Sequence, residues 1–197
     1  MIIDRLSQVK PLFEECLRWL KCQDYQFKGV ELKIGLLPRE QMASLANLRL
    51  GDPVTPLGMT RTRFTVRGNL RSGFEVDSIA IVSGLSEVSF RRVLIHELGH
   101  AWISLNEIQG LPLWVEEGFC ELLSYQYLKS CNRAETILAA EQIMQQADQL
   151  YGDGFRAMRD FSYQYGINRL RDEMVQAKGL PKNLKCYVAL QAAQTTR

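Results

Sequence analysis

Several features that would mark common protein classes are missing from this chain. Basic and acidic residues nearly balance, with 24 Lys and Arg against 22 Asp and Glu, so the composition implies no strong polyanionic partner such as nucleic acid. No apolar run approaches membrane-spanning length, and the charged N-terminus has no apolar signal-peptide core. The five cysteines are scattered without a C-x-x-C pair, which is typical of reduced thiols. We therefore expect a cytoplasmic protein that binds neither nucleic acid nor a membrane.

Histidine is also scarce, and both histidines lie in the five-residue string His96-Glu97-Leu98-Gly99-His100. On an α-helix, residues four apart share a face, so the two imidazoles can point at one metal ion. Glu97 is rotated by about 100° from His96, which places it beside such a metal, where a general base for water belongs. The string therefore predicts a catalytic zinc site with one Zn²⁺ per chain.

A site with two histidines needs a third protein ligand. A loop rich in helix breakers follows His100, and a second helical run then starts at Trp114. Glu116 and Glu117 compete for the ligand role there, because they point about 100° apart. Glu121 lies one turn beyond Glu117, well placed to hydrogen-bond a ligand histidine, which favours Glu117 as the ligand. Cys120 is on the same face, and we expect it to be a buried packing residue.

The periodicity of apolar residues predicts an α+β fold with a small mixed sheet, an active-site helix and then a mainly helical part. Its elements are a helix over 2–22, a strand over 30–37, a short helix over 38–46, a turn-rich loop over 50–58, strands over 59–66 and 77–82, and the zinc helix. Further helices are expected up to about residue 130, over 133–149 and 154–176, and after 181. We expect a single domain over 1–197, with an α/β part to about residue 105 and a helical part over 106–197 that supplies the third ligand.

The two metal-binding segments resemble those of a known family. The runs H-E-L-G-H-A-W over 96–102 and W-V-E-E-G-F over 114–119 look like the gluzincin metallopeptidases. The likeness is strongest to the peptidase domain of the ubiquitin-activated, LIM-domain growth-regulating peptidases of plants (the DA-one type). It covers about residues 29–182 and implies a zincin fold of minimal gluzincin type. The chain shows no LIM or ubiquitin-interacting segment, so we expect a stand-alone catalytic domain and do not carry over activation by ubiquitin.

The larger gluzincin aminopeptidases add two further expectations. Aligned on Gly118-Phe119, their W-L-N-E-G-F run places the third ligand on Glu117. Their Y-x-x-G-F run, whose tyrosine stabilises the tetrahedral intermediate, matches Tyr151; the alternative is that Tyr151 packs its ring at a helix start that Asp153 caps. In the same run, Arg156 could steady a substrate carbonyl or carboxylate, or form a surface salt bridge. Their upstream Gly-x-Met-Glu-Asn run is missing here, which argues against exopeptidase action.

An extended protein or peptide substrate of a zincin pairs with an edge strand beside the active-site helix, and we expect Ser78–Val82 to be that strand. In the preceding strand, Phe64 and Val66 face away from a set of arginines. These are Arg61, Arg63 and Arg67, with Arg71 nearby. They form either a solvated sheet face or a surface that favours acidic substrates or an acidic regulatory partner.

These observations predict a zinc-dependent endopeptidase. Glu97 would take the proton of the attacking water and return it to the leaving amine, and Tyr151 would help to stabilise the oxyanion. The alternative is a catalytically silent or latent protein-binding or regulatory module that zinc stabilises. Glu97 favours the enzyme, because a purely structural zinc site needs no base.

Overall fold

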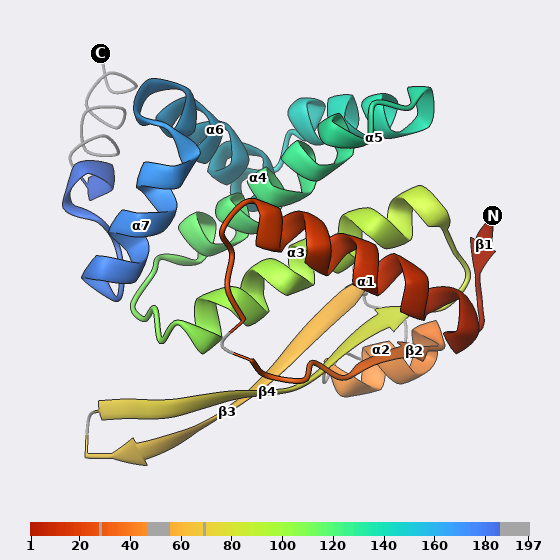
Figure 1. Ribbon diagram of the computed structural model, residues 1–197, viewed down its shortest axis with the longest axis horizontal. Helices are drawn as coiled ribbons and strands as arrows, with labels where there is room; N and C mark the ends of the chain where they lie inside the picture. The colour runs from red at the N-terminus through yellow and green to blue at the C-terminus, as the bar shows by residue number, and fades with distance from the viewer. Residues whose placement is uncertain (28, 47–55, 69, 186–197) are drawn as a thin grey trace.

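The computed structural model describes residues 1–27, 29–46, 56–68 and 70–185 (Figure 1). The first part of the chain contains strands and helices: β1 (Ile2–Ile3), α1 (Leu6–Cys22), β2 (Ile34–Leu37), α2 (Arg39–Leu45), β3 (Gly58–Arg67), β4 (Leu70–Val82), β5 (Leu85–Ser86) and α3 (Glu87–Leu105). The second part is helical: α4 (Leu113–Cys131), α5 (Ala134–Gln145), the π-helical turn η1 (Gln149–Asp153), α6 (Gly154–Tyr165) and α7 (Ile167–Ala177). The predicted α+β class, with strands first and helices afterwards, is confirmed.

The larger sheet has the strand order β2-β4-β3, with β2 parallel and β3 antiparallel to β4, so the predicted mixed sheet is confirmed. The central strand is β4, because Ile79 is in register with Ile34 on one side and Thr60 on the other. The prediction that Ser78–Val82 is the edge strand for a substrate is therefore wrong, since its main chain is paired on both sides. Within the described parts of the chain, the edge strand that lies along α3 is β3.

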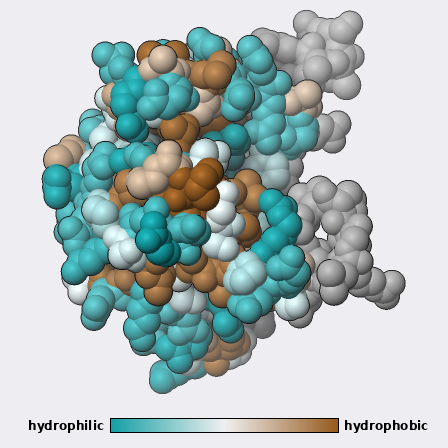
Figure 2. Space-filling view, turned by 90° about the vertical axis from the view of Figure 1, so that its right-hand side faces the viewer, coloured by the Kyte–Doolittle hydropathy of each residue, from teal (hydrophilic) through white to brown (hydrophobic). Residues whose placement is uncertain are grey.

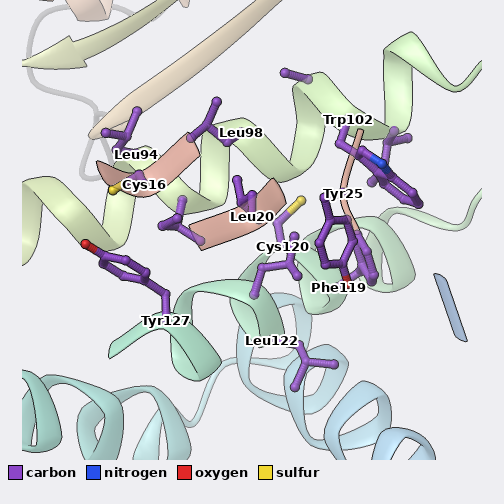
Figure 3. Packing of buried hydrophobic residues seen from close by; sticks show 14 of the residues in the cluster. Cys16, Leu20, Tyr25, Leu94, Leu98, Trp102, Phe119, Cys120, Leu122 and Tyr127 are labelled. Atoms are coloured by element: carbon purple, nitrogen blue, oxygen red, sulfur yellow. The ribbon is translucent and has the colours of Figure 1, made fainter. Parts of the chain in front are cut away.

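Helix α3 lies between the sheet and the helices α1 and α4. On the far face of the sheet, Met42 of α2 packs against Ala80 and Val82. On the near face, α3 joins the main core together with α1 and α4. Figure 3 shows how side chains of the three helices pack together in this core. Helix α3 contributes Leu94, Leu98 and Trp102, α1 contributes Leu20 and α4 contributes Phe119. Burial of each large apolar side chain contributes about 1.5–3 kcal/mol, so the helix that carries both histidines is held firmly.

Two predicted helices begin or end elsewhere because tertiary pairing or a glycine intervenes. The first helix begins at Leu6 instead of residue 2, since Ile2–Ile3 pair with Leu85–Ser86. The predicted helix over 154–176 is two helices, α6 and α7, separated at Gly166. That residue has φ 89°, a conformation that glycine adopts without steric cost.

Other predicted boundaries moved by several residues. The strand predicted over 30–37 is paired only from Ile34, and the one predicted over 77–82 already begins at Leu70, because it forms a long hairpin with β3. The helix predicted over 133–149 ends at Gln145, before η1. Residues 182–185 form the start of the predicted last helix, whose remainder lies outside the described residues, as does most of the loop predicted over 50–58.

Figure 2 shows the face of the molecule at the right-hand side of Figure 1, where hydrophilic residues surround hydrophobic ones near the middle. Near the N-terminus, Met1, Ile2 and Leu6 are exposed apolar residues. No helix in the described ranges is both long and apolar enough to cross a bilayer.

Candidate metal centre and catalytic site

The two histidines of α3 point at the same place. The Ser86 side chain caps the helix by accepting a hydrogen bond from the Ser89 N–H, which helps to set where the helix begins. Two turns later, the Nε2 atoms of His96 and His100 are 3.2 Å apart. Both side chains are largely buried. The one-turn spacing thus brings the two imidazoles together, as expected for residues on one helix face.

Helix α4 brings the carboxylate of Glu117 to these nitrogen atoms. Its Oε2 is 3.1 Å from Nε2 of His96 and 3.6 Å from Nε2 of His100, which closes a triangle of three potential ligand atoms. A tetrahedral metal ion with bonds of about 2.0–2.1 Å would hold its ligand atoms about 3.3–3.4 Å apart. The separations in this triangle fit such an ion.

Cys120, which lies about one turn after Glu117 on α4, is an alternative to Glu117 as the third metal ligand. The thiol and one nitrogen from each of His96 and His100 all lie within 4.8 Å of one another, so this cluster could hold a metal ion. The cysteine side chain is fully buried and packs against α3, where a Cβ on Gly99 would lie 2.8 Å from Sγ. The predicted packing role is therefore confirmed, with a possible ligand role beside it.

The outer nitrogen of each imidazole faces a carboxylate. Nδ1 of His100 is 3.0 Å from Oε1 of Glu116, within hydrogen-bonding distance. Nδ1 of His96 is 3.4 Å from Oε1 of Glu121, an ion-pair distance, and it forms no hydrogen bond with the described residues. Arg92 donates to both oxygens of Glu121 at 3.2 Å. Metal-binding histidines usually have such carboxylates at the nitrogen that points away from the metal.

The charges of these side chains reinforce one another. Burial works to lower the pKa of His96, but the carboxylates of Glu117 and Glu121 outweigh it and raise that pKa to about 10. Burial also works to raise the pKa of Glu117, but the two histidines lower it to about 2. The carboxylates thus favour the protonated form of His96, and the histidines favour the ionised form of Glu117.

Glu97 lies beside the histidines in a position that β3 determines. Its carboxylate is buried, and the Thr60 hydroxyl lies 2.8 Å from Oε2 and 2.9 Å from the main-chain oxygen of Glu97. A Cβ on Gly58 would lie 2.6 Å from Oε1, so the close approach of the strand requires glycine. Sequence reasoning missed Gly58 and Thr60, because they belong to no motif and lie 39 and 37 positions before Glu97.

Tyr151 of η1 completes the wall of the site. Its ring centroid lies 6.2 Å from that of His96, and the residue lines two adjoining cavities of about 290 and 280 Å³ next to the histidines. Burial and the negative charge of Glu117 raise the pKa of Tyr151, so its hydroxyl is a neutral hydrogen-bond donor at pH 7. The Tyr151 N–H donates to the Asp148 side chain at 2.6 Å, which begins η1.

Asp153 and Arg156 form an ion pair with each other, and neither lines the two cavities beside the histidines. Arg156 also donates to the main-chain oxygen of Gln146 at 2.8 Å, while the Gln146 side chain accepts from Arg92 at 3.2 Å. Of the two expectations for Arg156, the salt bridge is therefore confirmed. Asp153 occupies the N-cap position of α6, as expected, but its side chain makes no cap hydrogen bond. The side chain that accepts a cap hydrogen bond is that of Asp148, at the start of the preceding turn η1.

Comparisons with known proteins give one consistent relationship. Residues 58–140 match the DA1-like family (Protein DA1), a segment that contains β3, β4, α3 and α4 but ends before Tyr151. Among curated proteins, Protein DA1-related 3 of Arabidopsis thaliana is 44% identical over 33% of this chain and 14% of its own length. Protein DA1 of the same plant is 27% identical over 54% of this chain and 25% of its own length. The rice LIM domain-containing protein HDR3 is 26% identical over 54% of this chain and 28% of its own length.

The matches thus span less than a third of each relative's length. No solved structure matches the chain. The matched segment is the one that carries the His96–His100 pair, Glu97 and Glu117. The comparisons therefore support a relationship of this chain to the DA1-type family.

Proposed function

We propose that this protein is a zinc-dependent endopeptidase that hydrolyses peptide bonds of a protein substrate. The observation that carries the proposal is the triangle of ligand atoms from His96, His100 and Glu117, with the buried carboxylate of Glu97 beside it. A purely structural metal site does not need this fourth group.

Glu117 fits the third ligand position better than Cys120. Its oxygen lies 3.1 and 3.6 Å from the two Nε2 atoms, close to the spacing around a tetrahedral zinc ion, whereas the thiol belongs to a looser group that extends to 4.8 Å. With Glu116 and Glu121 placed at the outer nitrogens, both imidazoles present Nε2 to the metal.

When bound, zinc would polarise the scissile carbonyl and make water more acidic. The chain's own residues then move the proton. Glu97 takes a proton from the attacking water while the water oxygen bonds to the carbonyl carbon. Glu97 then delivers that proton to the amine nitrogen as the C–N bond breaks. The hydroxyl of Thr60 holds Oε2 of Glu97 in place, and Gly58 leaves room for Oε1.

Tyr151 is well suited to stabilise the negative charge that develops on the carbonyl oxygen. Its raised pKa keeps the hydroxyl protonated, and it lies in the wall of both cavities at the site. A neutral donor aimed at an oxyanion in a partly buried site lowers the barrier without adding a charge to the resting protein.

The free edge of β3 is the place for an extended substrate. The carbonyl of Leu57 accepts from the Val82 N–H at 2.8 Å, and hydrogen-bonded pairs alternate along an antiparallel ladder. The main-chain polar groups of Gly58 and Thr60 consequently point away from β4, toward the cavity that contains the histidines. A substrate strand can pair there while its scissile bond lies beside Glu97.

A second candidate function is a metal-stabilised regulatory module, which the cluster of His96, His100 and Cys120 favours. Metal content separates the two ligand sets. If Glu117 is the third ligand, Glu117→Gln weakens metal binding while Cys120→Ala leaves it unchanged. The opposite result would support the regulatory module.

The experiment that tests the endopeptidase is a search for new protein N-termini in a cell lysate treated with zinc-loaded protein, with Glu97→Gln as the matched control. We expect termini that only the wild type produces, while both proteins contain equal zinc. Equal zinc with no new termini would contradict the proposal.

A further inference from the structure

The face of β3 that lines the site continues far beyond it. Two register shifts interrupt the β3–β4 hairpin, between Arg61 and Thr62 and between Arg63 and Thr65. At both shifts β4 supplies the extra residue, so β3 keeps the regular alternation of its side chains. Every second residue of β3 therefore lies on the same face: Gly58, Thr60, Thr62, Phe64 and Val66.

The near end of this face belongs to the site. Thr60 contacts Glu97, and Thr62 lines the same cavity as His96 and His100. Figure 1 shows that the hairpin then runs on past the end of α3 that follows the histidines. The outer half of β3 is thus a direct extension of the wall beside the scissile bond.

The outer end of this face carries a group that we name the hairpin cluster: the exposed Phe64, Val66 and Arg71, and the half-buried Phe74. The rings of Phe64 and Phe74 are 5.2 Å apart, and the Arg71 guanidinium lies 4.8 Å above the Phe64 ring. Val66 is directly opposite Arg71 in the ladder. Phe64 and Val66 are 39% and 59% exposed, so a ligand can reach their apolar surface.

The hairpin cluster carries a positive charge that the protein itself does not neutralise. In the described residues, no carboxylate forms an ion pair with Arg71. Arg63, on the opposite face of β3, is different, because it pairs with Asp77 at 2.7 Å and with Glu75 at 3.6 Å. A ligand that brings a carboxylate to Arg71 and an apolar side chain to Phe64 would complement both properties.

The outer end of the hairpin is also held against the body of the protein. Glu107, just after α3, accepts a hydrogen bond from the Gly73 N–H at 3.3 Å. The Gln109 side chain donates to the main-chain oxygen of Arg71 at 3.1 Å. These bonds keep the hairpin cluster in a fixed position relative to the histidines, as a recognition surface requires.

Resting on the proposed function, we propose that the hairpin cluster is an exosite for the protein substrate. Along a strand, Phe64 and Val66 lie about 13 and 20 Å from Thr60. A substrate extended along β3 therefore reaches the cluster with residues about four to six positions from the scissile bond. Alternate residues of an extended strand share a face. At that distance the exosite therefore selects an apolar residue two positions from an Asp or Glu, the first packing on Phe64 and Val66 and the second pairing with Arg71.

The test is cleavage of a displayed library of random peptides, with sequencing of the cleaved members. The wild type should enrich an apolar–acidic pair at a constant offset, four to six residues to one side of the cleaved bond. Phe64→Ser combined with Arg71→Gln should lose that enrichment and lower kcat/KM for an enriched peptide about tenfold. Peptides too short to reach the hairpin should be cleaved equally by both proteins, which also shows that the double variant folds.

Two further variants sharpen the test. Arg71→Glu should replace the acidic preference at that offset by a basic one. Arg61→Gln, the matched control, removes an exposed arginine from the opposite face of the same strand and should leave the preference unchanged. An offset preference that survives in the double variant, or cleavage by the wild type without any distal preference, would overturn the exosite but leave the endopeptidase standing.

A wild type that cleaves no more than Glu97→Gln would overturn the proposed function instead. The hairpin cluster is then judged separately, by panning the same library on immobilised wild type and on Arg71→Glu. Capture of apolar–acidic peptides by the wild type alone would support the surface as a docking site, and equal capture would contradict it.

Discussion

Gly118 of α4 and Gly154 of α6 are in backbone contact. A Cβ on Gly118 would lie 2.3 Å from the carbonyl carbon of Gly154, and a Cβ on Gly154 would lie 2.3 Å from the main-chain oxygen of Trp114. Glu117 precedes the first glycine, and Tyr151 lies three residues before the second. One close approach of two helices thus sets the distance between the proposed third ligand and the proposed oxyanion donor.

Gly154→Ala should separate these helices and impair both stability and activity. The added methyl group has no space, and overpacking of this kind costs about 1–3 kcal/mol in the free energy of unfolding. The displaced η1 should also lower turnover. Urea unfolding and peptidase assays measure the two effects. Gly35→Ala is the control, because a Cβ there meets nothing within 4 Å; equal stability of the two variants would contradict the argument.

Tyr151→Phe should lower kcat about 10- to 100-fold with little change in KM or zinc content, because only the hydroxyl that stabilises the oxyanion is removed. The ring that packs near His96 remains. Steady-state kinetics and metal analysis of the same preparation measure both quantities. A Phe variant as fast as the wild type would restrict Tyr151 to packing.

Thr60→Val should lower kcat about tenfold without loss of zinc, since Glu97 loses the hydroxyl that orients its carboxylate. Thr60→Ser keeps the hydroxyl and should retain most of the activity. Thr65→Val is a matched control on the exposed part of the same strand. If Thr60→Val and Thr65→Val have the same kcat, Thr60 is not a positioning residue.

Metal affinity should rise with pH across the neutral range. A metal ion binds neutral imidazole, but the pKa of His96 is raised to about 10 and that of His100 is also well above its usual value. Binding must therefore displace protons from the imidazoles, and it weakens as the pH falls. Glu117, with a pKa of about 2, is already ionised and releases none.

Competition with a chromophoric chelator at pH 6.5, 7.5 and 8.5 measures this dependence. Each displaced proton should change the zinc affinity about tenfold per pH unit. Glu116→Gln removes the carboxylate at Nδ1 of His100, so it should lower the pKa of that ring and flatten the slope. A zinc affinity that does not change with pH would show that the imidazoles are neutral before the metal binds.

Much of the metal centre is predictable because its geometry is local. The one-turn spacing of His96 and His100 on a helix places them on the same face, and in the structure their Nε2 atoms are 3.2 Å apart. The position of Glu121 on the same helix face and the family resemblance both favour Glu117 over Glu116 as the ligand. In the structure, Glu117 faces both Nε2 atoms while Glu116 faces the outer nitrogen of His100.

The surroundings of the site depend on contacts between distant segments, and no local pattern contains them. The residues of 77–82 predict a strand but not its neighbours, and the predicted edge position of Ser78–Val82 is wrong because β2 and β3 enclose it. Thr60 reaches Glu97 across 37 residues only because α3 packs along β3. Local periodicity in the sequence therefore determined which residues could bind a metal, while the tertiary packing decided which strand borders them, what orients the base and where a substrate can lie.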